Sequence, residues 1–193
     1  MSFINAKEKE VNCKIAYFGA QAAGKSTNIQ HICQKTGVEE KNKIISLSNH
    51  EDGSLFFDFL PLSLGKVNGY KVRVHVYTVP GQLIYHSSRN LILKGVDGVV
   101  FVVDSQIDRL EQNLESWKNL QITLKNHDAD FQTIPLALQY NKQDLKNILP
   151  SSELHKFFNS RNLLEFETVA KKGTNVMECF QAVAKQVLLN LKK

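Results

Sequence analysis

Residues 19–27 read GAQAAGKST, which fits the pattern G-x-x-x-x-G-K-[ST]. Glycines in such a loop let the backbone turn sharply, so that successive N–H groups point toward an anion. The pattern follows an apolar run at residues 11–18 that predicts a strand. It precedes residues 28–33, whose apolar side chains have helical spacing. This strand–loop–helix context predicts a phosphate-binding loop and argues against a chance match.

The loop residues have distinct expected roles toward a bound triphosphate. Lys25 is expected to reach the β- and γ-phosphates and to assist catalysis. The Ser26 hydroxyl is expected to ligate a Mg²⁺ ion that bridges two phosphate oxygens. The predicted nucleotide-binding residues of the loop are Gly19, Ala20, Gln21, Ala22, Ala23, Gly24, Lys25, Ser26 and Thr27.

Bulk properties narrow the class of protein. The chain has 193 residues, and we expect residues 1–193 to form a single domain. Its net charge of +5 is spread along the sequence, which favours a solvated surface and gives no support for nucleic-acid binding. Cys13, Cys33 and Cys179 lie within apolar patterns without zinc spacing, so buried thiols in a reducing cytoplasm are expected. No lipidation motif or long apolar run is found, so we expect no direct membrane anchor.

Apolar runs alternate with helical patterns along the chain, which predicts an α/β fold with a mostly parallel sheet and helices on both faces. The expected strand–helix pairs are residues 11–18 with 27–36, 98–104 with 107–126, 134–140 with 151–159, and 163–170 with 174–191. Residues 55–64 and 70–78 break the alternation. They are joined by GKVNG at residues 65–69, and its Asn-Gly predicts an antiparallel hairpin. Pro61 favours an edge position for this hairpin, because proline lacks an N–H to donate.

Asn141-Lys142-Gln143-Asp144 follows the predicted strand at residues 134–140, at the end of a strand where open α/β sheets bind ligands. The Asp144 carboxylate can accept two N–H bonds from the N1 and N2 edge of guanine, and adenine has neither donor there. Such a site rejects an analogue that lacks the donors by up to about 10⁴–10⁵. Asn141 would brace the loop, and the Lys142 stem would cover the base. An ordinary polar turn is the alternative, but together with the phosphate loop the motif predicts GTP and GDP as ligands.

Thr78-Val79-Pro80-Gly81-Gln82 ends the second strand of the predicted hairpin. Its form suggests that the Gly81 N–H meets the γ-phosphate and that Gln82 orients the attacking water. Gly81 and Gln82 are therefore candidate catalytic residues, together with Lys25. A plain Pro-Gly turn is the alternative.

These motifs, with LFFDFLPL at residues 55–62 and LILKGVD at residues 91–97, closely resemble the bacterial MglA family of Ras-like small GTPases over nearly the whole chain. The resemblance implies a Ras-like P-loop NTPase fold and a switch that controls cell polarity and motility. It implies a dimeric roadblock-fold (MglB-like) activator, and effectors that bind through switches at residues 39–60 and 78–92. It also implies a cytoplasmic location with recruitment to a cell pole by partners.

The resemblance implies further site residues. Ala170 and Lys171 are expected beside the base, with the Ala170 N–H facing the guanine O6. Ser54 is expected in the first switch as a second hydroxyl ligand of Mg²⁺, engaged only when the γ-phosphate is present.

The sequence departs from the family pattern at several positions. Thr78 stands where most Ras-like proteins have aspartate, so no carboxylate is expected there, and Mg²⁺ affinity is predicted to be weaker than in typical Ras-like proteins. Gly53 replaces an arginine thought to act in cis on the phosphate, a group worth about 10³–10⁵ in rate, so hydrolysis is expected to be slow and activator-dependent. Gln21 occupies a loop position that is often glycine, and it either crowds Gln82 or points into solvent. The arginines left as substitutes are Arg73, Arg89, Arg109 and Arg161.

Two functions of different classes fit these residues. One is a GTP-hydrolysing switch, favoured by Gln82. The other is a GTP-binding interaction module with little or no turnover, favoured by Gly53 and Gln21. A P-loop kinase or ATPase is disfavoured by Asp144 and by the lack of a recognisable acceptor lid.

Overall fold

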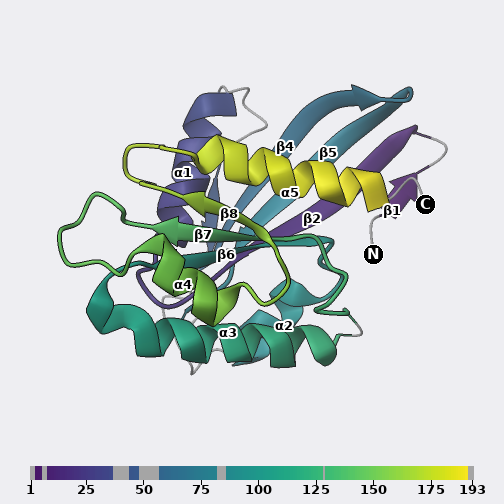
Figure 1. Ribbon diagram of the computed structural model, residues 1–193. Coiled ribbons are helices and arrows are strands. Elements are labelled where there is room, and N and C mark those ends of the chain that lie inside the picture. The colour runs from purple at the N-terminus through teal and green to yellow at the C-terminus, as the bar shows by residue number, and fades with distance from the viewer. Residues whose placement is uncertain are drawn as a thin grey trace.

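The computed structural model of the chain describes residues 3–5, 8–36, 44–47, 57–81, 86–127 and 129–190 (Figure 1). The strands within these ranges are β1 (Phe3–Asn5), β2 (Glu10–Phe18), β3 (Ile45–Leu47), β4 (Phe57–Val67), β5 (Tyr70–Thr78), β6 (Gly98–Asp104), β7 (Leu136–Asn141) and β8 (Leu164–Glu167). The helices are α1 (Lys25–Thr36), α2 (His86–Leu93), the 3-10 turn η2 (Ile107–Arg109), α3 (Leu110–Lys125), α4 (Ser151–Phe158) and α5 (Val176–Asn190).

The strands form one sheet in the order β3-β4-β5-β2-β6-β7-β8, and β1 pairs with β2 outside this path. The strands from β5 to β8 in this order run parallel, whereas β4 is antiparallel to both β3 and β5. This confirms the predicted α/β fold with its antiparallel pair. The short strand β3 lies outside the hairpin, and the pairing that the described residues show covers positions 57–59 of β4.

The hairpin between β4 and β5 turns at Asn68 and Gly69. Both residues have left-handed backbone angles, with φ of 51° and 82°. A type I′ turn requires positive φ at both central positions, and Asn-Gly satisfies this at low cost. The connection is therefore a two-residue turn rather than the five-residue linker expected, and β4 extends to Val67. A register shift between Ser63 and Lys66 marks a bulge in β4.

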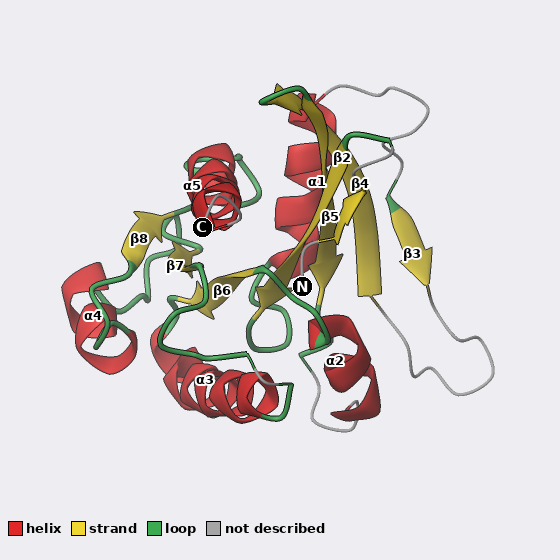
Figure 2. Cartoon of the chain, turned by 90° about the vertical axis from the view of Figure 1, so that its right-hand side faces the viewer, coloured by secondary structure: helices red, strands yellow, loops and turns green. Residues whose placement is uncertain are grey.

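Helices cover both faces of the sheet, with α1 and α5 on one face and α2, α3 and α4 on the other (Figures 1 and 2). Side chains of β6 alternate between the two cores: Val100 and Val102 pack with α1 and α5, whereas Phe101 packs with the opposite helices. Trp117 of α3 meets Phe101 edge-on at a centroid distance of 4.7 Å. Because both faces of β6 are buried, its sequence is an unbroken apolar run rather than an alternation.

The three cysteines are free thiols, of which Cys13 and Cys179 are buried and Cys33 is half-buried. Burial, with a smaller contribution from the nearby Asp97 charge, raises the pKa of Cys13 to about 12, so this thiol is unreactive at neutral pH. Among the described residues, no helix combines the length and apolar character needed to cross a bilayer.

The end of the sheet opposite β3 is the four-residue strand β8, which pairs with β7. Its side chains are mostly exposed. Glu165 accepts a hydrogen bond from the Tyr140 hydroxyl at 2.5 Å and lies 3.0 Å from His155 Nδ1. Desolvation alone would raise the pKa of Glu165, but these hydrogen bonds outweigh it and lower the pKa below its ordinary value.

Candidate nucleotide-binding site

The expected site residues that the structure describes lie on the side of the sheet where the carboxyl ends of its parallel strands meet. Residues 19–24 follow β2, and Asn141 ends β7. Asp104 ends β6, and Ala170 follows β8 after a short connection. The phosphate loop and the predicted base-binding loop are therefore close in space although far apart in sequence.

The backbone of the phosphate loop depends on its glycines. Gly19 and Gly24 have φ of 152° and 106°, which L side chains rarely adopt. A Cβ atom on Gly19 would lie 2.2 Å from the Val102 carbonyl oxygen, and one on Gly24 would lie 2.3 Å from Asn141 Nδ2. Both glycines of the pattern are thus required by backbone angle and by close approach of a neighbour.

Lys25 opens α1 and folds back over the loop that precedes it. Its side-chain nitrogen donates to the carbonyl oxygens of Gly19 at 2.9 Å and Ala20 at 2.7 Å, and the residue is only 8% exposed. Ser26 and Thr27 follow in the first turn of α1 and are half-buried. The predicted phosphate-binding residues therefore lie at the positive N-terminal end of this helix.

Asn141 connects the loops of the site. Its Nδ2 donates to the Ala23 carbonyl at 2.8 Å. Its Oδ1 accepts from the Ala170 N–H at 2.9 Å and from the Thr168 hydroxyl at 3.1 Å. The residue is 2% exposed, so these bonds are protected from water. Asn141 thus joins the base-binding motif to the phosphate loop and to the Ala170 backbone, and its part in nucleotide binding stays a prediction.

The other residues of the base-binding motif lie at the same edge. Lys142 has a left-handed backbone with φ of 69°, and its Nζ donates to Asp104 Oδ2 at 2.6 Å. The Asp144 carboxylate lies 3.8 Å from Lys172 Nζ, and its side chain is 28% exposed. Lys171 is exposed. The carboxylate expected to read guanine is therefore accessible to a ligand.

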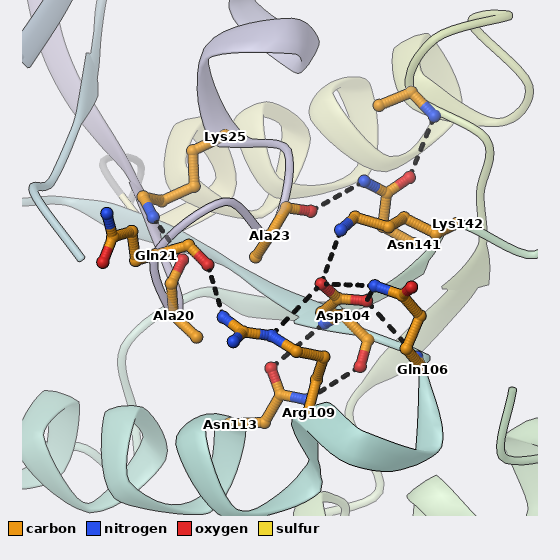
Figure 3. Close-up of polar contacts among 11 residues, drawn as sticks. Ala20, Gln21, Ala23, Lys25, Asp104, Gln106, Arg109, Asn113, Asn141 and Lys142 are labelled. Carbon is orange, nitrogen blue, oxygen red and sulfur yellow. Dashed lines mark hydrogen bonds and ion pairs between the residues drawn. The ribbon is translucent and has the colours of Figure 1, made fainter. Parts of the chain in front are cut away.

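Asp104 is a further functional candidate, which the sequence predicted only as the last residue of a strand. Its carboxylate is completely buried and accepts hydrogen bonds from Lys142 Nζ and from Gln106 Nε2 at 3.0 Å. Arg109 Nε lies 3.6 Å away (Figure 3). A buried carboxylate is costly unless it is paired and hydrogen-bonded, and here both conditions are met. Its place at the carboxyl end of a predicted parallel strand was the signal that could have identified it.

The arginines considered as substitutes for the residue missing at position 53 have different environments. Arg109 Nη2 donates to the Gln21 carbonyl of the phosphate loop at 2.8 Å (Figure 3). Arg73 pairs with Glu10, and Arg161 donates to the Gln132 carbonyl near the start of β7. The side chain of Arg89 is outside the described residues. Among the arginine side chains that the structure describes, Arg109 is thus the one bonded to the phosphate loop.

Thr78 has a carboxylate beside it, contrary to expectation. Its hydroxyl accepts from the Asp58 N–H at 2.7 Å and lies 3.4 Å from Asp58 Oδ2. Asp58 is on β4 and is 5% exposed. The expectation that no carboxylate lies at this position was therefore wrong, because the antiparallel neighbour supplies one. The sequence could not show this, because the pairing joins positions on two different strands.

Gly81 lies against the phosphate loop, since a Cβ atom placed on it would be 2.4 Å from the Gln21 nitrogen. The Gln21 side chain is exposed, which agrees with the solvent-pointing alternative. Gln82, Ser54 and Gly53 are outside the described residues, so their expected roles remain predictions.

Comparison with known proteins agrees with this site. Residues 14–189 match the Ras family. The chain belongs to this family of small GTPases, which bind guanine nucleotides and hydrolyse GTP. It is 55% identical over 193 residues to the mutual gliding-motility protein MglA of Myxococcus xanthus (strain DK1622), covering 100% of this chain and 99% of the relative. It is 25% identical over 186 residues to the Ras-related protein Rab-7a of Dictyostelium discoideum, covering 95% and 86% of the two chains.

Proposed function

We propose that the nucleotide of this GTPase switch lies across the carboxyl ends of β2, β7 and β8. Residues 19–27 would surround the phosphates, with Lys25 at the β- and γ-phosphates. Asp144 would read the guanine edge, Lys142 would cover the base, and the Ala170 N–H would face O6 beside Lys171. This assignment rests mainly on the hydrogen bonds of Asn141. Its side-chain amide bonds both to the phosphate loop and to the Ala170 backbone.

Hydrolysis would be carried out by the segment that follows β5. The Gly81 N–H would meet the γ-phosphate, and Gln82 would orient the attacking water. The contact between Gly81 and the Gln21 backbone supports this, because it brings the segment against the phosphate loop.

The donor set of the site fits Mg²⁺, a hard cation that prefers oxygen ligands. Ser26 and Ser54 would supply hydroxyl ligands, and Asp58 beside Thr78 supplies a buried carboxylate. The ion would neutralise charge on the phosphates.

Asp58→Asn should lower the Mg²⁺ affinity of the GDP-bound protein by about tenfold, the effect of losing one charged partner. A Mg²⁺ titration of nucleotide release checks this. Release at the same Mg²⁺ concentration in both proteins would contradict the role of Asp58.

The cellular role that fits best is control of cell polarity and motility, because the 55% identical relative is named a gliding-motility protein. A dimeric roadblock-fold protein would be the activator, and effectors would bind through residues 39–60 and 78–92. The protein would act in the cytoplasm and reach a cell pole through its partners, without direct contact with nucleic acid.

Single-turnover hydrolysis of bound GTP, with and without a cognate roadblock protein, tests the proposal. Acceleration by the partner is expected, and Gln82→Ala should abolish it. Binding of GTP without turnover in both conditions would instead favour the interaction module. Displacement of bound GTP by ATP would contradict the guanine assignment of Asp144.

Gly53→Arg should speed activator-stimulated hydrolysis, because an arginine in cis stabilises charge on the transferred phosphate. The gain could reach the lower end of the range for such groups, about 10³-fold. Gly53→Lys is the matched control, because lysine adds charge without the planar fork. An unchanged rate in Gly53→Arg would argue that another residue already fills this role.

A further inference from the structure

Arg109 connects a buried carboxylate to the phosphate loop. Its Nη2 donates to the Gln21 carbonyl at 2.8 Å, and its Nε lies 3.6 Å from Asp104 Oδ2 (Figure 3). The side chain is 27% exposed, whereas that of Asp104 is fully buried. A guanidinium presents its donors in a fixed fork, so an anchor at one nitrogen orients the others. Asp104 therefore directs Arg109 at the loop.

The bond to Gln21 fixes the plane of the peptide that joins Gln21 to Ala22. In a trans peptide the carbonyl and the N–H point in opposite directions. Because the Gln21 carbonyl points to Arg109 at the end of η2, the Ala22 N–H points away from Arg109. A charged donor on the carbonyl also polarises the peptide and strengthens its N–H as a donor.

Ala22 shows that this peptide needs to be held. Its φ is 61°, which is a left-handed backbone conformation. This conformation is energetically unfavourable for an L residue with a Cβ atom, and it persists only where the surroundings impose it. The residue is also exposed, so packing does not impose it. The charged hydrogen bond to the Gln21 carbonyl is one constraint, and the turn bond from the Ala23 N–H to the Ala20 carbonyl at 3.3 Å is another.

The same carboxylate reaches the base-binding motif. Asp104 Oδ2 accepts from Lys142 Nζ at 2.6 Å and faces Arg109 Nε. One buried group thus holds Lys142 of the base-binding motif and Arg109, the residue that donates to the phosphate loop.

We propose that Arg109, anchored by Asp104, is a positioning residue that turns the Gln21–Ala22 peptide so that the Ala22 N–H faces the phosphates, and that Asp104 links this arrangement to the base-binding loop. The proposal rests on the proposed assignment of residues 19–27 as the phosphate loop. It requires no contact between Arg109 and the nucleotide.

The test uses the full chain and a fluorescent GDP analogue. Arg109→Ala should release GDP about 10- to 100-fold faster, the range expected for loss of a charged hydrogen bond. GMP affinity, measured by competition, should change by less than about twofold, because the loop that the variant disturbs is the one proposed to hold the outer phosphates. Asp104→Asn should weaken both ligands, because it also loosens Lys142.

An NMR measurement separates positioning from general stability. The amide proton of Ala22 in the GDP-bound protein should shift upfield in Arg109→Ala, because its hydrogen bond to phosphate weakens. Arg109→Lys keeps a cation but loses the fork, so its GDP release should lie between those of wild type and Arg109→Ala. This variant keeps the test open if Arg109→Ala does not fold.

Arg161→Ala is the matched control, because Arg161 also donates to a backbone carbonyl, that of Gln132. It should release GDP at the wild-type rate. Wild-type release and an unshifted Ala22 amide in Arg109→Ala would overturn the proposal, as would equal losses of GDP and GMP affinity. If the proposal failed in this way but Lys25→Ala abolished GDP binding, the assignment of residues 19–27 as the phosphate loop would still hold. A wild-type protein that bound no GDP would contradict the proposed function itself.

Discussion

At the scale of single residues, Asn141 shows how one side chain can set the geometry of a site. Its amide satisfies a backbone carbonyl of the phosphate loop and a backbone N–H of the Ala170 loop. Both groups are buried, and a buried polar group without a partner costs about 1–3 kcal/mol. Removing Asn141 would therefore leave both loops with unpaired groups.

Asn141→Ala should weaken GDP binding by about 2–4 kcal/mol, the sum of two such losses reduced by local relaxation. Titration calorimetry of the nucleotide-free protein with GDP checks this. Asn147→Ala is the control, since Asn147 is exposed in the same loop, and it should bind as wild type does. Equal affinities in all three proteins would show that Asn141 does not organise the site.

Sequence motifs predicted Asn141, Lys25 and Asp144 as site residues, because a local pattern carries their chemistry. They did not identify Asp104 or the contact of Arg109 with Gln21. These depend on a strand end, a 3-10 turn and a loop that meet only in the folded chain. The carboxylate of Asp58 beside Thr78 was missed for the same reason.

At the scale of elements, the β4–β5 hairpin is set by its turn. The Asn-Gly pair predicted the antiparallel arrangement correctly. The lengths of the strands were less predictable. The sequence GKVNG was expected to be a linker, but β4 continues through a bulge into the first part of it. The sequence did not predict three short elements, namely the three-residue strands β1 and β3 and the helix α2. An element of so few residues is too short to show a clear hydrophobic period.

Gly69→Ala should lower the free energy of unfolding by about 1 kcal/mol, because Gly69 has φ of 82° and alanine is strained there. Urea unfolding checks this. Lys71→Ala, on the exposed face of β5, is the control and should change stability by less than about 0.5 kcal/mol. Equal midpoints for Gly69→Ala and wild type would mean that the turn accommodates a side chain without strain.

At the scale of the whole molecule, two groups make stability depend on pH in the same direction. Burial, together with the Arg73 charge, lowers the pKa of His75 below its ordinary value of 6.5. The pKa of Glu165 is also lowered, from 4.5. A group whose pKa is lower in the folded state contributes stability above its unfolded pKa and loses it on acidification. The protein should therefore lose stability first below pH 6.5 and again below pH 4.5.

His75→Gln should flatten the pH dependence of unfolding just below pH 6.5, because glutamine does not titrate. Urea unfolding at a series of pH values measures the slope. Arg73→Ala keeps His75 but removes a positive neighbour, so it should flatten the slope only in part. A slope in His75→Gln equal to that of wild type would assign the acid sensitivity to other groups.

The strand β8 has a consequence for behaviour at high concentration. It ends the sheet, so its outer backbone groups are open to pairing with a strand of another molecule, the usual route to edge-to-edge aggregation. Its sequence is LEFE, so Glu165 and Glu167 alternate with apolar residues along four positions. Two copies aligned at this edge would bring like charges together. The short, acidic edge thus discourages fibre growth at the same place where it fixes Tyr140 and His155 inside one molecule.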